Sequence, residues 1–206
     1  MKSNCRYYLA AVAVASLATV CAQANPITGS IYENDPTGAT DATPGNVPAG
    51  PANVTFTTDD PINFSSGGLY TIGEFLASGN GSTILTGAGE LGNTLDNCLF
   101  NFVGDVTVTS GQTFTVGHDD GLTLIINGLT VISAPGPTSF DNTSETYTGP
   151  SGTFPFQLVY GECCGAPGDL SISLPLSNVP DGGSTLALLG GALTLVGTGA
   201  RRFRKN

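Results

Sequence analysis

Residues 112–132 read QTFTVGHDDGLTLIINGLTVI, and this stretch decides the fold of the chain. Apolar and polar residues alternate on both sides of the HDDG sequence at 118–121, which is the period-two pattern of half-buried β-strands. Asn127-Gly128 then favours a type I′ hairpin turn, because both central positions of that turn need a positive φ. The stretch predicts three strands and two turns. It places the acidic pair Asp119-Asp120 at one tip of a sheet, in a loop of the kind that often carries binding sites.

The charged residues are distributed very unevenly. All six Lys and Arg residues lie at the two ends of the 206-residue chain, and all sixteen acidic residues lie between them, for a formal net charge of −10. The long interior therefore has no cationic patch for phosphate groups, which excludes nucleic-acid binding. The same imbalance leaves carboxylates free to bind metal cations.

Residues 1–24 are typical of an export signal with a signal helix. Lys2 and Arg6 accompany an apolar run at 7–20, and the A-x-A sequence at 22–24 predicts cleavage between Ala24 and Asn25. Cys21 raises a lipoprotein alternative, but Val20 stands where a lipobox needs a small residue. We therefore expect an exported chain that matures in an oxidising setting.

Three cysteines remain after this cleavage, namely Cys98, Cys163 and Cys164. An odd number allows one disulfide and a free thiol, an intermolecular bond, or no bond. We expect a disulfide from Cys98 to Cys163 or Cys164, because two adjacent cysteines would close a very small ring. A zinc site that adds His118 as the fourth ligand is an alternative.

The mature chain divides into three parts. Residues 25–53 are rich in Pro, Gly, Asn, Asp and Thr, which indicates a flexible arm. Residues 54–176 contain about eight short strand candidates separated by Gly-rich turns, among them 98–103 and 106–109. Residues 69–77 predict one short helix or a coiled edge segment. This pattern predicts an all-β fold, an antiparallel, jelly-roll-like β-sandwich.

Three motifs in order resemble the protective-antigen-type (PA-fourteen) domain and its fibro-slime relatives. They are FTVGHDDGLTLIING at 114–128, YTGPSG at 147–152 and FQLVYGE at 156–162. The resemblance implies a β-sandwich over roughly residues 98–174. In sugar-binding members of that family an adjacent Asp pair holds a calcium ion that contacts sugar hydroxyls, which by position implies Asp119 and Asp120 here. Trp is absent, and no aromatic residue is evident beside this pair.

Residues 179–206 resemble the PEP-CTERM sorting tail in its Val-Pro-Asp-Ser-Gly variant. A motif is followed by an apolar segment at 186–200 and a basic end at 201–205. The apolar segment, a short hydrophobic helix, is shorter than the ~20 residues that span a bilayer comfortably, which favours transient anchoring in the inner membrane and later removal. The resemblance implies an exosortase-type enzyme as partner and delivery to the bacterial cell envelope or extracellular matrix. The motif residues are Val179, Pro180, Asp181, Gly182, Gly183, Ser184 and Thr185.

Two functions follow from these patterns. The first is an exported surface or matrix protein, structural or adhesive, that binds calcium and extracellular polysaccharide. The alternative is a secreted carbohydrate-active enzyme or accessory module. No nucleophile motif such as G-x-S-x-G is present, so we name no catalytic residue and favour the first. The simpler interpretations are an Asx turn at Asp119-Asp120, a turn position for His118 and a solvated loop carboxylate at Glu162.

Overall fold

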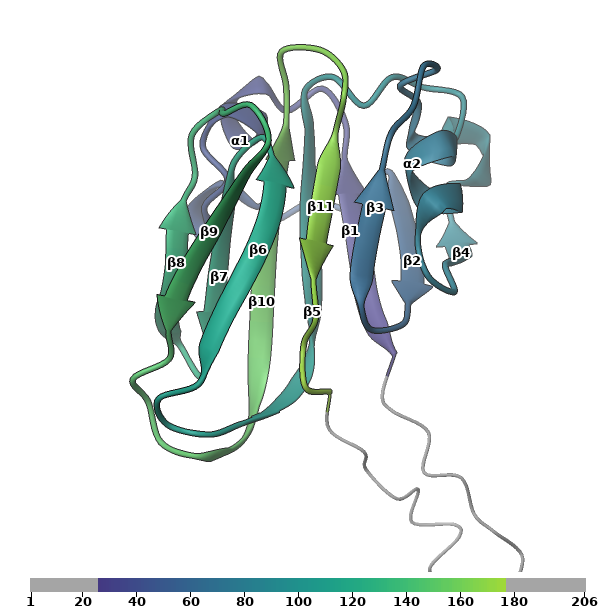
Figure 1. Cartoon of the computed structure of the whole chain (residues 1–206). Helices are drawn as coiled ribbons and strands as arrows, with labels where there is room; N and C mark the ends of the chain where they lie inside the picture. The colour runs from purple at the N-terminus through teal and green to yellow at the C-terminus, as the bar shows by residue number, and fades with distance from the viewer. Residues whose placement is uncertain (1–25, 177–206) are drawn as a thin grey trace, which may run out of the picture. The chain divides into compact units, whose positions relative to one another are not determined.

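The computed structural model describes residues 26–176, which form two antiparallel sheets packed face to face (Figure 1). The larger sheet has the strand order β4-β2-β1-β5-β10-β7-β8, and the smaller has the order β3-β11-β6-β9. The predicted all-β antiparallel sandwich is confirmed. The helices predicted at the two ends of the chain lie outside the described residues. Within 26–176, no helix combines the length and the apolar character that crossing a membrane requires.

The elements have the following bounds. The larger sheet consists of β1 (Ile27–Tyr32), β2 (Val54–Thr58), β4 (Thr83–Thr86), β5 (Cys98–Val108), β7 (Leu122–Ile126), β8 (Leu129–Ala134) and β10 (Gly152–Glu162). The smaller sheet consists of β3 (Ile62–Ser65), β6 (Thr113–Asp119), β9 (Asp141–Thr146) and β11 (Asp169–Ile172). The helices are α1 (Pro36–Thr40) and α2 (Ile72–Ser78), with short 3-10 turns η1 (Pro44–Asn46) and η2 (Ala88–Glu90).

Aromatic side chains fill the space between the sheets. The Phe64 ring stacks on Phe75 with centroids 5.0 Å apart, and the Phe56 ring meets Phe102 edge to face at 5.8 Å. Offset and edge-to-face contacts of this kind add to the free energy of area burial. Gly29 of β1 lies under the Phe56 ring, where any Cβ would overlap the ring atoms. The core therefore depends on a glycine at this point of β1.

The prediction of a flexible arm over 25–53 is wrong. β1 pairs with both β2 and β5, and the side chains of Ile27 and Ile31 are fully buried. Farther on, Asp35 caps α1 by accepting the Gly38 N–H at 3.0 Å, and Ala42 is buried in a small apolar cluster on β5 and β10. The segment is polar in composition, but tertiary pairing supplies partners for its backbone, which composition cannot show.

The predicted hairpin turn and the predicted short helix are both present in the structure. Ile126 pairs with Leu129 across the β7–β8 hairpin, and Asn127 and Gly128 have φ values of 54° and 73°. The type I′ prediction is thereby confirmed. The short helix is confirmed as α2, with Thr71 as its N-cap. The two strands predicted at 98–103 and 106–109 are one continuous strand, β5, because β10 pairs along its whole length.

We predict that β1 is essential for stability. Replacing Ile31 by Ala should lower the free energy of unfolding by about 2–5 kcal/mol, since the side chain is fully buried between strands. Urea denaturation followed by fluorescence or circular dichroism measures the loss. Thr28→Ala, at an exposed position of the same strand, serves as the control and should change stability by no more than about 0.5 kcal/mol. Equal stability of the parent and Ile31→Ala would contradict a packed β1.

Candidate functional site

The acidic pair lies where the chain crosses from one sheet to the other. β6 ends at Asp119 in the smaller sheet, and β7 begins at Leu122 in the larger sheet. The predicted position at one tip of a single sheet is therefore wrong, because the period-two pattern does not tell which sheet a strand joins. Asp119 and Asp120 are joined by a cis peptide bond and are only 9% and 5% exposed. The connection between the two sheets thus leaves Asp119 and Asp120 with little solvent exposure.

Backbone N–H groups from two other loops hold these carboxyl groups. Asp120 accepts the Thr138 N–H at 3.1 Å and the Cys163 N–H at 2.9 Å, one at each carboxyl oxygen. Asp119 accepts a backbone hydrogen bond from Phe140. Since these donors are distant in the sequence, the pair is not the Asx turn considered above. The three segments converge on one point only after folding.

His118 orients the crossing from the core side of β6. Its Nδ1 lies 2.6 Å from the Asp120 carbonyl oxygen, and its Nε2 lies 2.8 Å from the Thr143 hydroxyl oxygen. A carbonyl oxygen can only accept, so Nδ1 carries the hydrogen and donates it. The side chain is 1% exposed. His118 is therefore a buried strand residue and not the turn histidine expected from sequence.

A buried carboxyl group stands behind the acidic pair. Glu162, at the end of β10, is fully buried, which corrects the expectation of a solvated loop carboxylate. Its Oε1 accepts the Tyr70 hydroxyl at 2.7 Å, and its Oε2 is hydrogen-bonded to the Tyr160 hydroxyl. The Tyr160 hydroxyl is also bonded to the Asp119 carbonyl oxygen. Glu162 thus connects to the acidic pair through one phenol.

Burial and two nearby carboxyl groups favour a neutral Glu162. Tyr70 donates its hydroxyl hydrogen to Glu162. The Tyr160 hydroxyl is placed to donate to both the Asp119 carbonyl and Glu162 Oε2, so its single hydrogen is shared between two acceptors. Burial, as the largest cause, raises the pKa of Glu162 from 4.5 to about 9. The protonated acid is therefore the form present at neutral pH.

The acidic pair itself lies in an environment that opposes its ionisation. Burial is the main cause that raises the pKa of Asp119 and of Asp120, and the Asp120 charge raises that of Asp119 further. The backbone hydrogen bonds described above act in the opposite direction. No Lys or Arg occurs in residues 26–176 to balance the charge. A bound cation would stabilise both carboxylates at once.

The acidic pair opens onto a pocket of about 440 Å³, which we call the acidic pocket. A disulfide between the adjacent residues Cys163 and Cys164 also lines the pocket, directly beside Asp120. Cys164 is exposed, and its N–H donates to the Asp96 carboxylate at 3.0 Å. The lining residues are Asp119, Asp120, Pro137, Thr138, Ser139, Cys163, Cys164, Gly165, Ala166 and Pro167.

The predicted bond from Cys98 to Cys163 or Cys164 is wrong. Cys98 pairs directly with Glu162 across β5 and β10, so its side chain faces the core on the same side as that carboxyl group. Cys163 and Cys164 follow where the chain leaves the strand and bond to each other. Their sulfur atoms are consequently not thiolate ligands, which also removes the zinc alternative.

Sequence reasoning missed an aromatic side chain beside the pair. Phe140 is 52% exposed, and its backbone N–H donates a hydrogen bond to the Asp119 carboxyl group. It lies 21 positions after Asp119 and is isolated among polar residues, so neither spacing nor periodicity marks it. Only the fold of residues 135–140 around the crossing brings it to the site.

Comparison with known proteins bears on the tail and on the fold. Residues 178–203 match the VPDSG-CTERM motif, which confirms the sorting-tail interpretation and indicates an exported, surface-associated protein. The fold is similar to the PA14 domain of the antifreeze protein MpAFP (24% identity, 77% of this chain and 83% of that chain, TM-score 0.51). It is also similar to the PA14 sugar-binding domain of an RTX adhesin (19% identity, 73% and 88% coverage, TM-score 0.52). No curated protein matches the chain.

These likenesses confirm the PA14-like fold that the three sequence motifs predicted. The sorting-motif residues 179–185 and the predicted cleavage between Ala24 and Asn25 lie outside the described residues. Their processing therefore stays a prediction.

We predict that Glu162 makes the stability of the domain depend on pH. Between pH 4.5 and about 9 the folded state retains a proton that the unfolded state releases, so the free energy of unfolding falls as pH rises. The slope is at most about 1.4 kcal/mol per pH unit. In Glu162→Gln the amide keeps one donor and one acceptor for the two phenols without titrating. Thermal unfolding in chelator from pH 5 to 9 should show a weaker decline for this variant.

Glu145→Gln, at an exposed position of β9, is the matched control and should follow the parent. Parallel curves for the parent and Glu162→Gln would contradict a neutral buried Glu162.

We also predict one free thiol in the mature protein that begins at Asn25. Alkylation under denaturing, non-reducing conditions should modify Cys98 alone, and prior reduction should raise the number to three. In the native state Cys98 should not react, because burial raises its pKa to about 12 and hides the sulfur. Intact-mass measurement counts the modified thiols. A peptide that links Cys98 to either of the other cysteines would overturn this assignment.

Proposed function

We propose that this exported surface protein is an adhesin-type module that binds glycan through a calcium ion held by Asp119 and Asp120. The observation that carries the proposal is the burial of two adjacent carboxyl groups at the floor of an open pocket without a basic partner. Carboxylate oxygens are the preferred ligands of calcium, and the folded scaffold fixes their positions.

The donor set fits a calcium ion. Each carboxyl oxygen of Asp120 accepts one N–H, which leaves a further lone pair on each for a cation. Asp119 and Asp120 provide carboxylate ligands, and carbonyl oxygens of the lining loops and water would complete the six to eight oxygens that calcium takes. Two carboxylates neutralise the charge of one divalent ion.

Three features support glycan as the ligand. The acidic pocket is open to solvent, so a bound ion keeps coordination positions for sugar hydroxyls. Phe140 presents an exposed ring next to Asp119, and the apolar face of an aromatic ring suits the apolar C–H faces of sugars. One similar fold belongs to a domain described as the sugar-binding domain of an adhesin. The proposed partner is therefore extracellular polysaccharide.

The tail completes the proposal. We propose that an exosortase-type membrane enzyme recognises the motif within residues 178–203 and removes the apolar and basic end during transit through the inner membrane. The domain would then be released to the cell envelope or the extracellular matrix. Display at that place is consistent with a binding module.

The proposal predicts that calcium stabilises the purified protein. Calcium at about one hundred times its Kd should add roughly 2.7 kcal/mol, which raises Tm by roughly 5–10 °C relative to chelator. Asp120→Asn should lose this difference, whereas Asp59→Asn, an exposed acid between β2 and β3, should keep it. The comparison is made within each protein, because Asp120→Asn also weakens the two backbone hydrogen bonds.

A glycan array with and without chelator tests the second half of the proposal. Glycan binding that disappears in chelator and in Asp120→Asn supports it, and equal melting temperatures in both buffers contradict it. Release of new reducing ends from a bound glycan would favour the alternative of a carbohydrate-active enzyme.

A further inference from the structure

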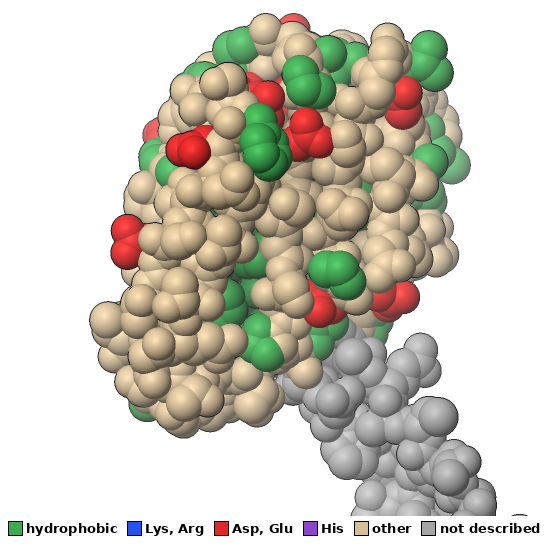
Figure 2. All heavy atoms as spheres, in the orientation of Figure 1, with side chains coloured by type: hydrophobic (Ala, Val, Ile, Leu, Met, Phe, Trp, Pro, Cys, Tyr) green, Lys and Arg blue, Asp and Glu red, His purple; other side chains and the backbone are tan. Residues whose placement is uncertain are grey.

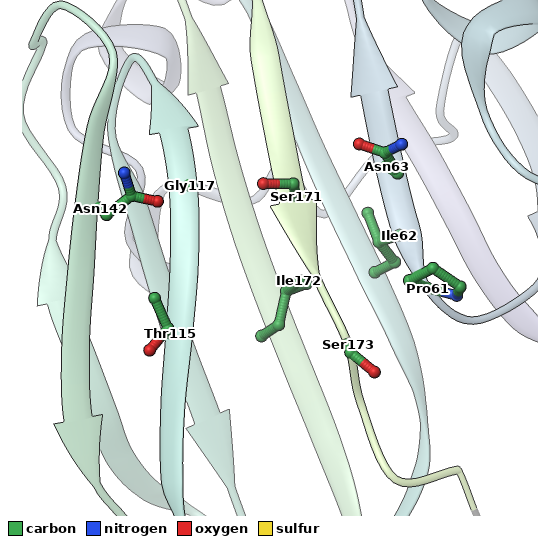
Figure 3. A pocket seen from close by; sticks show the side chains of 9 residues that line it. All are labelled: Pro61, Ile62, Asn63, Thr115, Gly117, Asn142, Ser171, Ile172 and Ser173. Atoms are coloured by element: carbon green, nitrogen blue, oxygen red, sulfur yellow. The ribbon is translucent and has the colours of Figure 1, made fainter.

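A second hollow lies on the outer face of the smaller sheet. It has a volume of about 270 Å³ and lies over β3, β11, β6 and β9, and we call it the sheet groove. Figure 3 shows the Ser171 side chain on β11, between Asn142 on β9 and Asn63 on β3. The hydrogen-bonding side chains of the groove are Asn63, Thr115, Asn142, Ser171 and Ser173.

A glycine keeps the floor of the sheet groove low. Gly117 of β6 occupies a position whose side chain would point outward, because its neighbours Val116 and His118 face the core. A Cβ there would lie 2.6 Å from Ser171 Oγ and 3.1 Å from Asn142 Oδ1. A side chain at position 117 would therefore have to displace Ser171 and Asn142, and it would occupy part of the hollow.

Phe140 connects the sheet groove to the acidic pocket. Its backbone N–H donates a hydrogen bond to the carboxyl group of Asp119, a residue that lines the acidic pocket. Its ring reaches the other hollow, since Cζ lies 3.1 Å from the Cβ position of Gly117. The ring is 52% exposed, which is unusual for a Phe side chain in this domain. Phe140 thus contacts one lining residue of each hollow, Asp119 through its backbone and Gly117 through its ring.

The chemistry of the sheet groove is uncharged. None of its nine lining residues is acidic or basic, and its amide and hydroxyl groups both donate and accept hydrogen bonds. Figure 2 looks onto this face and shows mainly uncharged polar and backbone surface, with isolated acidic side chains and no basic ones. An anionic polymer would find no cation among residues 26–176. Hydroxyl-rich neutral chains match such a surface best.

We propose that the sheet groove binds the following residues of a neutral polysaccharide whose first sugar occupies the acidic pocket. The chain would pass over the Phe140 ring and lie along β6 and β11. This inference rests on the proposed function, because the calcium site fixes the first sugar. It adds that the ligand is an uncharged chain several sugars long and not a single terminal sugar. Affinity should accordingly grow with chain length.

The experiment is calorimetric titration of the purified protein, in saturating calcium, with uncharged gluco-, manno- and galacto-oligosaccharides of one to six residues. For the series that binds, Kd should fall at least about tenfold between one and four residues. Gly117→Ala, which places a methyl group in the groove, should abolish this gain and change the monosaccharide Kd less than about twofold. Phe140→Ala should also abolish the gain, and it should weaken monosaccharide binding as well, because its ring lies beside the calcium-held sugar.

Leu85→Ala is the matched control, because it removes another exposed apolar side chain at the edge of the larger sheet. It should bind every oligosaccharide as the parent does. The calcium-dependent rise in Tm of each variant confirms that its fold and its ion site are intact.

The possible results separate the two proposals. Monosaccharide binding with a Kd that does not change with length, or a length gain that survives in both Phe140→Ala and Gly117→Ala, overturns the groove and leaves the calcium site standing. A length gain that persists in chelator supports the groove and contradicts the calcium-held first sugar. Lack of binding in all three series, at every length, overturns both.

Discussion

Carboxyl groups in residues 26–176 have to be accommodated without a single Lys or Arg. The fold does this with neutral donors. Backbone N–H groups hold Asp120, and Glu74 likewise accepts the N–H groups of Leu69 and Tyr70. Phenols hold Glu162, which retains its proton. Because no basic side chain is available in this part of the chain, backbone N–H groups and phenols supply the partners of the carboxyl groups around the crossing.

Those neutral bonds also tie the site to the core. The Tyr160 ring packs on Phe100 with centroids 5.4 Å apart, while its hydroxyl holds the Asp119 backbone. The geometry of the acidic pair therefore rests on the packing between the sheets and not on its own loop. A binding site on a rigid support loses little conformational entropy when it takes a ligand. The backbone of Phe140 is held in the same way, because its N–H donates a hydrogen bond to the Asp119 carboxyl group.

Local patterns in the sequence were sufficient for the strands and for one turn. Alternation predicted β6, β7 and β8, and Asn127-Gly128 predicted the hairpin, because both depend on neighbours in the chain. The sequence motifs likewise predicted the fold of the domain and the tail. The same patterns placed Asp119-Asp120 at the tip of a single sheet, since β6 and β7 alternate equally well in one sheet or in two. The choice of sheet depends on pairing with β11 and β10, which lie far along the chain.

The remaining errors share this cause. Residues 25–53 read as an arm because their composition is polar, yet β1 pairs on both sides within the larger sheet. Glu162 read as a solvated acid because a lone carboxylate next to two cysteines gives no sign of burial, and its partner Tyr70 is 92 residues away. Phe140 has no periodic neighbours at all. Periodicity, spacing and composition describe only local sequence, so they could not predict the structural role of residues whose partners lie far along the chain.

The absence of Lys and Arg from the interior of the chain also affects its resistance to proteases outside a cell. Proteases of the trypsin type recognise a Lys or Arg side chain through an acidic pocket, and the chain has no such residue between Arg6 and Arg201. Transient opening of the sandwich, which normally exposes cleavable segments, would offer these enzymes nothing to cut. Resistance to this large class of enzymes is thus a property of the covalent chain and does not depend on how stable the fold is.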